Sequence, residues 1–224
     1  MEEKITTGNE ELDKALEGGY EKEIITTIYG PAGSGKSNLC LLCAVSASRM
    51  GKKVIFVDTE SSFSIERLKQ ISPDHEKILE NMMIFKPASF EEQKKVLLEI
   101  KKLNFDNIGL VIVDTIVMLY RVQRNKFDSY ELNRDLGLQI SNLSDLARKK
   151  NIPVILTSQV YSPMNGGNDI KIVGGDILNY ASKCVIELQN FKNVHKLILK
   201  KHRSIGEKII DYKITASGIE IIPR

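Results

Sequence analysis

GPAGSGKS, residues 30–37, matches the phosphate-binding loop pattern G-x-x-x-x-G-K-[S/T] at every required position. Its glycines let the backbone form a concave nest of N–H groups that converge on an anion. The lysine places a point charge on the β- and γ-phosphates, and the serine hydroxyl is suited to ligate Mg²⁺. The pattern therefore predicts a nucleotide site made by consecutive residues, namely Gly30, Pro31, Ala32, Gly33, Ser34, Gly35, Lys36, Ser37 and Asn38.

The segments on either side of this loop support the interpretation. Residues 23–29 (EIITTIY) are rich in β-branched side chains and predict a buried strand, and residues 38–50 predict a helix. Such a helix would direct its positive N-terminal end at the phosphates. A strand, a loop and a helix in this order are the context in which the pattern binds phosphate.

The rest of the chain first alternates strands with helices and then turns to strands alone. A brief helix is expected within residues 7–20, and charged or glycine-rich loops are expected at residues 121–129 and 161–175. The expected strands are residues 52–58, 82–86, 110–113, 153–157, 184–189, 195–201, 209–214 and 218–222. The expected helices are residues 64–71, 74–81, 90–102 and 130–150. This order predicts an α/β fold with a mainly parallel sheet, flanking helices and an antiparallel C-terminal meander.

Length and charge limit the alternatives. A chain of 224 residues suits one large domain, which we expect to span residues 1–224. The net charge of +3 is only mildly basic, so any nucleic-acid surface must come from local clusters. The sequence has no run of about 18 apolar residues and no apolar signal-peptide core at its start. We therefore expect a cytosolic protein that does not associate with membranes.

The three cysteines and two of the histidines are candidates for a metal or redox site. Cys40 and Cys43 form a C-x-x-C, but no second Cys/His pair lies near enough in sequence to complete a zinc site. Both fall on one apolar face of the expected helix, so core packing is the favoured reading. His195 and His202 are expected at the surface rather than as metal ligands.

Polar side chains end three of the expected strands. LVIVD, residues 110–114, delivers Asp114 from an apolar strand, as a carboxylate that binds Mg²⁺ would require. Glu60 in VDTES can activate water or be a solvated loop residue. Gln159 in ILTSQV can sense the γ-phosphate or lie on the surface. Spacing alone does not separate these alternatives for Glu60 and Gln159.

Four further segments carry a family resemblance. VDTESSFSIERL, LVIVDT, PVILTSQV and GGDILNYASKCVIEL follow the order and spacing of the RecA/RadA recombinase core. The opening TTGNEELDKALEGGY also looks like the start of that core, so the resemblance covers nearly the whole chain from about Thr7. The match is best to short archaeal paralogues of RadA that lack its N-terminal DNA-binding domain.

The resemblance implies a RecA-like ATPase core that uses ATP and Mg²⁺. By position, Glu60 would activate the attacking water, and Gln159 and Lys36 would complete the catalytic set. Ser37 and Asp114 would hold the metal. Arg67 would stack on adenine, a contact open to a planar guanidinium. Residues 121–129 and 161–173 would be the two DNA-facing loops.

Basic residues gather in three places. The largest cluster lies between residues 192 and 208 and has one acid, Glu207, against Lys192, Lys196, Lys200, Lys201, Arg203 and Lys208. The expected loops add Arg121, Arg124, Lys126 and Lys171. Such clusters bind single- or double-stranded DNA by releasing counterions, and the alternative is a solvated face. Lys201 and Arg203 also resemble a K-x-R element that a homo-oligomer inserts into a neighbouring nucleotide site.

Three departures weaken the prediction of a complete recombinase. No segment before Thr7 carries an F-x-x-A type polymerisation element, and the second loop has one basic residue, Lys171, and one aromatic, Tyr161. We therefore expect a protein of homologous recombination and DNA repair that assists a RadA-type recombinase and hydrolyses ATP weakly. The alternative is a KaiC-like ring ATPase acting on proteins. A small-molecule kinase would need an arginine-rich lid, which the sequence lacks.

Overall fold

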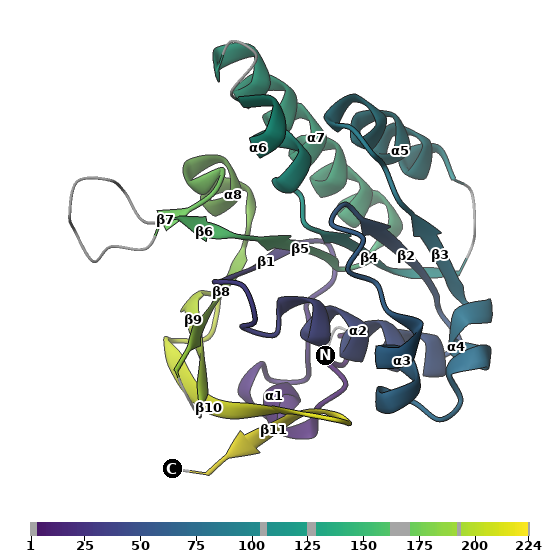
Figure 1. Ribbon diagram of the computed structural model, residues 1–224, viewed down its shortest axis with the longest axis vertical. Coiled ribbons are helices and arrows are strands. Elements are labelled where there is room, and N and C mark those ends of the chain that lie inside the picture. The colour runs from purple at the N-terminus through teal and green to yellow at the C-terminus, as the bar shows by residue number, and fades with distance from the viewer. Residues whose placement is uncertain (1–3, 104–106, 125–128, 162–170, 192–193, 224) are drawn as a thin grey trace.

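A computed structural model of the chain describes residues 4–103, 107–124, 129–161, 171–191 and 194–223 (Figure 1). Its centre is a nine-stranded sheet. In chain order the strands are β1 (Ile25–Tyr29), β2 (Lys53–Asp58), β3 (Met82–Phe85), β4 (Ile108–Asp114), β5 (Val154–Ser158), β8 (Cys184–Asn190), β9 (His195–Lys201), β10 (Lys208–Thr215) and β11 (Gly218–Ile222). Two short strands, β6 (Val160–Tyr161) and β7 (Lys171–Ile172), pair separately.

The sheet has a parallel half and an antiparallel half. Its spatial order is β11-β10-β9-β8-β1-β5-β4-β2-β3. The strands from β8 to β3 run parallel, whereas β9, β10 and β11 are added antiparallel to their neighbours. All residues of β4 are buried, as an uninterrupted apolar run in the centre of a parallel sheet should be. The expected α/β architecture with an antiparallel C-terminal meander is confirmed.

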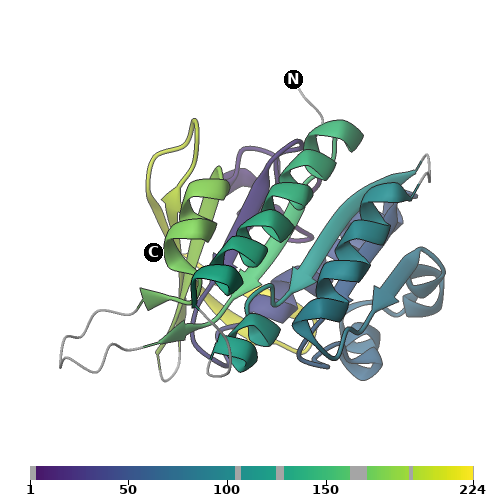
Figure 2. The same ribbon diagram turned by 90° about the horizontal axis from the view of Figure 1, so that it is seen from above.

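Helices cover both faces of the sheet (Figures 1 and 2). The helices are α1 (Glu10–Ala15), α2 (Lys36–Arg49), α3 (Ile65–Ile71), α4 (His75–Glu80), α5 (Phe90–Lys102), α6 (Met118–Arg124), α7 (Ser129–Lys150) and α8 (Gly175–Ala181). The apolar side chains of α1 and α2 form one core with the sheet. Those of α5, α6, α7 and α8 form the other. None of the helices among the described residues is both long and apolar enough to cross a membrane.

Two segments differ from the sequence-based expectation. Residues 121–124 are not irregular but belong to α6, because Tyr120 is buried and packs edge-on against Phe90 with ring centroids 6.0 Å apart. The sequence does not reveal this short helix, because its charged residues are more conspicuous than the apolar residues that it buries. The second difference is α8, which begins after Gly174 and buries Leu178 in the core. The sequence predicts only a loop up to residue 175, the first residue of this helix.

Candidate nucleotide-binding site and basic cavity

The phosphate-binding loop connects the end of β1 to the start of α2. Gly35 adopts a left-handed conformation with φ of 90° and directly precedes the helix. A Cβ atom at Gly30 would lie 2.4 Å from the carbonyl oxygen of Leu188, so β8 leaves room only for glycine. In the described part of the chain no side chain caps α2, and its first N–H groups can therefore serve an anion.

Lys36 is buried at the centre of this loop. Its Nζ donates hydrogen bonds to the carbonyl oxygens of Gly30 and Pro31, at 2.8 and 2.9 Å. Burial lowers the pKa of Lys36, while the Asp114 and Glu60 carboxylates act to raise it. The ammonium group thus lies among loop carbonyls and acids, where a phosphate oxygen can replace the carbonyls as its partner.

Carboxylates stand side by side at the ends of β2 and β4. Asp58 and Asp114 are partners in the strand register, and both are buried. Asp114 accepts hydrogen bonds from Ser62 Oγ, at 3.2 Å, and from Thr157 Oγ1. Asp58 accepts from the backbone N–H groups of Ser62 and Phe63, at 2.9 and 3.0 Å. It thereby shapes the turn that carries Glu60, a role that sequence reasoning missed although VDTES contains both acids.

Glu60 and Gln159 come from different strand ends and meet directly. Gln159 Nε2 donates to Glu60 Oε1 at 2.6 Å, and Thr115 Oγ1 donates to the same oxygen at 3.1 Å. Arg121, on α6, donates to Gln159 Oε1 at 3.3 Å. The backbone carbonyl of Gln159 accepts from the N–H of Val173 at 3.0 Å. Gln159 therefore links the nucleotide end of the sheet to both of the segments expected to face DNA, through its side chain to α6 and through its backbone to Val173.

These groups fit a nucleoside triphosphate with Mg²⁺. The loop supplies an ammonium group and uncapped helical N–H groups for phosphates. A hydroxyl at Ser37 and carboxylate oxygens at the ends of β2 and β4 are the hard oxygen ligands that Mg²⁺ prefers. The metal and catalytic roles of the individual side chains stay predictions.

Arg67 lies beside this site, and the nitrogens along the edge of its guanidinium group donate hydrogen bonds. Its Nε donates to Asn38 Oδ1 at 3.0 Å, and its terminal nitrogens donate to the carbonyl oxygens of Thr215 and Ala216 at 2.7 and 2.9 Å. The side chain thus joins α3 to the start of α2 and to the β10–β11 turn. Adenine stacking would use the face of the guanidinium rather than its edge, and it stays a prediction.

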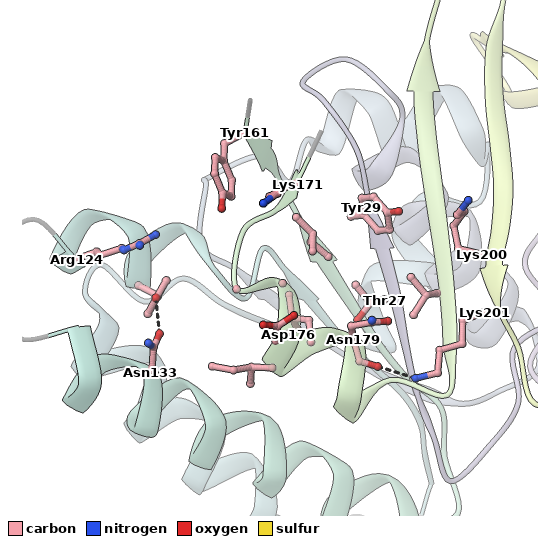
Figure 3. Close-up of a pocket in the computed structure, with 17 residues that line it drawn as sticks. Thr27, Tyr29, Arg124, Asn133, Tyr161, Lys171, Asp176, Asn179, Lys200 and Lys201 are labelled. Atoms are coloured by element: carbon pink, nitrogen blue, oxygen red, sulfur yellow. Dashed lines mark hydrogen bonds between the residues drawn. The ribbon is translucent and has the colours of Figure 1, made fainter. Parts of the chain in front are cut away.

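A second concave region, a cavity of about 900 Å³, lies on the other side of β1 from the phosphate-binding loop (Figure 3). Four predicted DNA-binding cations line it, and they come from α6, β7 and β9: Arg124, Lys171, Lys200 and Lys201. Tyr29 and Tyr161 also line it, and Asp176 is the one acid in its described lining. We call this region the basic cavity.

Among the described residues, the other predicted cations do not line the basic cavity. Lys126 and Lys192 fall outside the described residues. Arg203 Nε lies 2.8 Å from Glu21 Oε2, and Lys208 Nζ donates to the carbonyl oxygen of Ala15 at 2.8 Å. The cluster read from residues 192–208 is therefore not one surface, because successive side chains of the β9–β10 hairpin point in different directions.

The β9–β10 turn corrects one histidine assignment and locates the K-x-R element. His202 is not at the surface: its side chain is 2% exposed and lies 3.8 Å from Glu21. Burial lowers the pKa of His202. Lys201 pairs in register with Val185, which is level with Thr27 on β1, so the turn lies at the end of the sheet opposite the phosphate-binding loop. Insertion of Lys201 and Arg203 into a neighbouring site stays a prediction.

The cysteines behave as the sequence indicates. Cys40 and Cys43 are free and buried on α2, where they belong to the apolar core. Within the part of the chain that the structure describes, no group of three or more His, Cys, Asp or Glu side chains could hold a metal ion. Core packing of the C-x-x-C is confirmed.

A mainly parallel sheet whose first strand ends in a phosphate-binding loop, with acids at neighbouring strand ends, defines a RecA-like nucleotide-binding protein. Comparison with known proteins narrows this class. The Rad51 family model matches residues 3–221. The chain therefore belongs to the Rad51 family.

Two of its relatives within this family match it in length. The chain is 46% identical to "DNA repair and recombination protein RadB" of Methanococcus maripaludis over 215 residues, which covers 94% of this chain and 98% of that protein. It is 45% identical to the RadB protein of Methanobrevibacter smithii, with 96% and 95% covered. A solved structure described as the RadB recombinase superposes with a TM-score of 0.83 at 34% identity, covering 98% of this chain and all of that one.

Proposed function

We propose that this protein binds ATP with Mg²⁺, binds DNA, and acts in homologous recombination and DNA repair as an accessory to a RadA-type recombinase. Membership of the Rad51 family supports the role in recombination. The similarity to proteins named RadB over nearly their full length supports the same role. The complete phosphate-binding loop supports nucleotide binding.

The observation that carries the proposal is the hydrogen-bonded path from Glu60 through Gln159 to Arg121. In this proposal Glu60 orients water at the γ-phosphate of the bound nucleotide. Because Gln159 bonds to Glu60 and to Arg121 at once, any change in the partners of Glu60 alters the bonds available to α6. The path is a physical means for the nucleotide to regulate DNA affinity.

We infer weak hydrolysis from the state of Glu60. Its Oε1 already accepts hydrogen bonds from Gln159 and Thr115. These bonds occupy one of the two carboxylate oxygens and hold the carboxylate in one orientation, which restrains Glu60 as a general base. Nucleotide binding, rather than rapid turnover, is then the regulatory event.

The basic cavity is the proposed DNA-binding surface. Its four cations come from segments far apart in the sequence and line one concave region (Figure 3), where the Lys200 ammonium group also lies 3.5 Å from Glu207. Tyr29 and Tyr161 add aromatic surface on which unstacked bases can lie. Phosphate contacts from these cations would make DNA affinity strongly dependent on salt.

Two binding measurements on the wild-type chain test the proposal. Calorimetry should detect binding of ATP in the presence of Mg²⁺. Fluorescence anisotropy should show affinity for single-stranded DNA falling about 50-fold between 50 and 200 mM salt, as expected for about four phosphate contacts. Equal DNA affinity at both salt concentrations would refute the DNA-binding surface. Stable ring hexamers with ATP turnover independent of DNA would instead favour an ATPase that acts on proteins.

The accessory role has its own test. Strand exchange by a purified RadA-type recombinase would be measured with and without this protein at equal DNA and ATP concentrations. We expect the wild-type chain to stimulate or inhibit strand exchange by the recombinase. We also expect efficient exchange only when the recombinase is present. Strand exchange by this chain alone would contradict the accessory role.

A further inference from the structure

We propose that Tyr212, on β10, is a positioning residue that holds the phosphate-binding loop in its anion-binding form. The inference rests on the proposed nucleotide binding and adds a residue that no phosphate-loop pattern contains. Tyr212 is fully buried, and its hydroxyl donates a hydrogen bond of 2.5 Å to the carbonyl oxygen of Ser34. Burial raises the pKa of Tyr212 far above its usual range, so the hydroxyl keeps its proton and remains a donor.

The geometry of one peptide bond explains why this contact matters. The carbonyl of Ser34 and the N–H of Gly35 belong to the same planar trans peptide, so they point in opposite directions. A donor that fixes the Ser34 oxygen on the side of β10 therefore turns the Gly35 N–H toward the opposite side. That N–H belongs to the nest of donors expected to surround the phosphates.

A second residue of β10 supports the same segment. A Cβ atom built on Gly35 would lie 3.1 Å from Ile214 Cδ1, so the isoleucine side chain packs directly against this glycine. Gly35 has the left-handed conformation that lets α2 begin immediately after the loop. Tyr212 and Ile214 are two residues apart on a strand, and both therefore face the loop.

The hairpin formed by β10 and β11 also holds the other side of Lys36. Asn38 Nδ2 donates to the carbonyl oxygen of Gly218 at 2.9 Å, and Arg67 ties Asn38 to Thr215. Residues 34 and 38 are thus both attached to one hairpin, with Lys36 and Ser37 between them. A loop that is already ordered loses less conformational entropy when a nucleotide binds.

Tyr212→Phe is the direct test, because it keeps the ring and removes only the hydroxyl. Calorimetry with ATP and Mg²⁺ should show affinity about three- to tenfold weaker than that of the wild type, the range expected for one lost hydrogen bond. The matched control is Tyr20→Phe. Tyr20 is equally buried, and its hydroxyl has no hydrogen-bond partner in the described part of the chain. Its removal should leave ATP affinity unchanged.

Further measurements separate positioning from a purely structural role. DNA affinity without nucleotide should be equal in Tyr212→Phe and wild type. A lower melting temperature together with wild-type ATP affinity would overturn the inference, because the hydroxyl would then stabilise only the hairpin. If the wild type itself fails to bind ATP, the proposed function falls and this inference falls with it. A loss of ATP affinity in Tyr212→Phe but not in the wild type or in Tyr20→Phe supports both the proposed nucleotide binding and the role of Tyr212.

Ile214→Ala provides an independent variant should Tyr212→Phe not fold. It removes the contact with Gly35 from a side chain that is 38% exposed, so folding should survive. We expect ATP affinity to weaken about two- to threefold, since only part of one apolar contact is lost. Ile209→Ala, on the same strand and 41% exposed, is the control and should bind ATP as the wild type does. Equal affinities in these two variants would count against support by β10.

Discussion

The phosphate-binding loop and the basic cavity lie on either side of β1 and are constructed in opposite ways. Residues 30–37 supply the whole loop from one contiguous segment, which its own glycines and the flanking strand and helix shape and which Tyr212 supports from β10. The cavity takes its cations from α6, β7 and β9, which only the folded sheet brings together. A local motif can thus be recognised without the fold, whereas a surface made of distant residues cannot.

The two regions are nevertheless connected at two points. Tyr29 lines the cavity and is the residue immediately before Gly30. Gln159 bonds through its side chain to Glu60 and through its backbone to Val173, which is followed by the cavity-lining Gly174. If the regions are separate in binding but coupled in regulation, variants should be able to damage either one alone.

Lys36→Ala should have the largest effect and should be confined to the nucleotide region. Loss of the buried ammonium group should reduce ATP affinity by about 100-fold or more, as for one removed partner of a buried charge pair. DNA affinity without nucleotide should stay within about twofold of the wild type, because Lys36 does not line the cavity. Calorimetry and anisotropy provide the two values.

Lys69→Ala is the control for Lys36→Ala, because Lys69 is exposed on α3. It should bind both ATP and DNA as the wild type does. If Lys36→Ala lowered affinity for DNA as strongly as for ATP, the phosphate-binding loop and the basic cavity would be one site rather than two.

Glu60→Gln should affect turnover and spare nucleotide binding. The amide keeps an oxygen that can accept from Gln159 but cannot take a proton from water, so the hydrolysis rate should fall about 100-fold. ATP affinity should change less than about threefold. Phosphate release under single-turnover conditions measures the rate, and Glu66→Gln, an exposed acid in the first turn of α3, is the matched control. An unchanged rate would exclude Glu60 as the base.

The difference between the regions also shows what the sequence could predict. The strands of the parallel half, the phosphate-binding loop and the position of Asp114 follow from apolar runs and from a pattern with fixed spacing. The sequence does not predict which basic residues line the cavity. Lys201 points toward α8, whereas Arg203, two positions later, points toward Glu21. Charge is visible in a sequence, but the direction of a side chain at a hairpin end depends on the turn.

The sequence also does not predict the structural roles of Asp58 and Tyr212, for a similar reason. The sequence predicts Asp58 only as the end of a strand, yet its carboxylate accepts hydrogen bonds from backbone N–H groups and so holds the turn that carries Glu60. Tyr212 lies far from the phosphate-binding loop in sequence and reaches it only because three antiparallel strands extend the sheet and curve over α2 (Figure 1). Contacts of this kind leave no periodic signal in the sequence.

Paired substitution of Arg124 and Lys171 by alanine should damage the cavity alone. Both side chains are exposed, and they come from different elements of its lining. DNA affinity at low salt should fall about tenfold, and the slope of log affinity against log salt should become shallower by about 1.5, since two phosphate contacts are lost. ATP affinity should not change. The double variant Lys69→Ala/Lys149→Ala removes two exposed lysines elsewhere and should match the wild type in both measurements.

Arg121→Ala should have the smallest effect, and it bears on the connection between the regions. Within the described part of the chain the Arg121 side chain makes one hydrogen bond, of 3.3 Å to Gln159 at the surface, so its loss should cost little stability. The measured quantity is the ratio of DNA affinities with and without ATP, which we expect to move about two- to threefold toward unity. Arg124→Ala, on the same helix, should lower both affinities equally and leave the ratio intact. If Arg121→Ala left the ratio unchanged as well, coupling would have to pass through Val173 or Tyr29 rather than through α6.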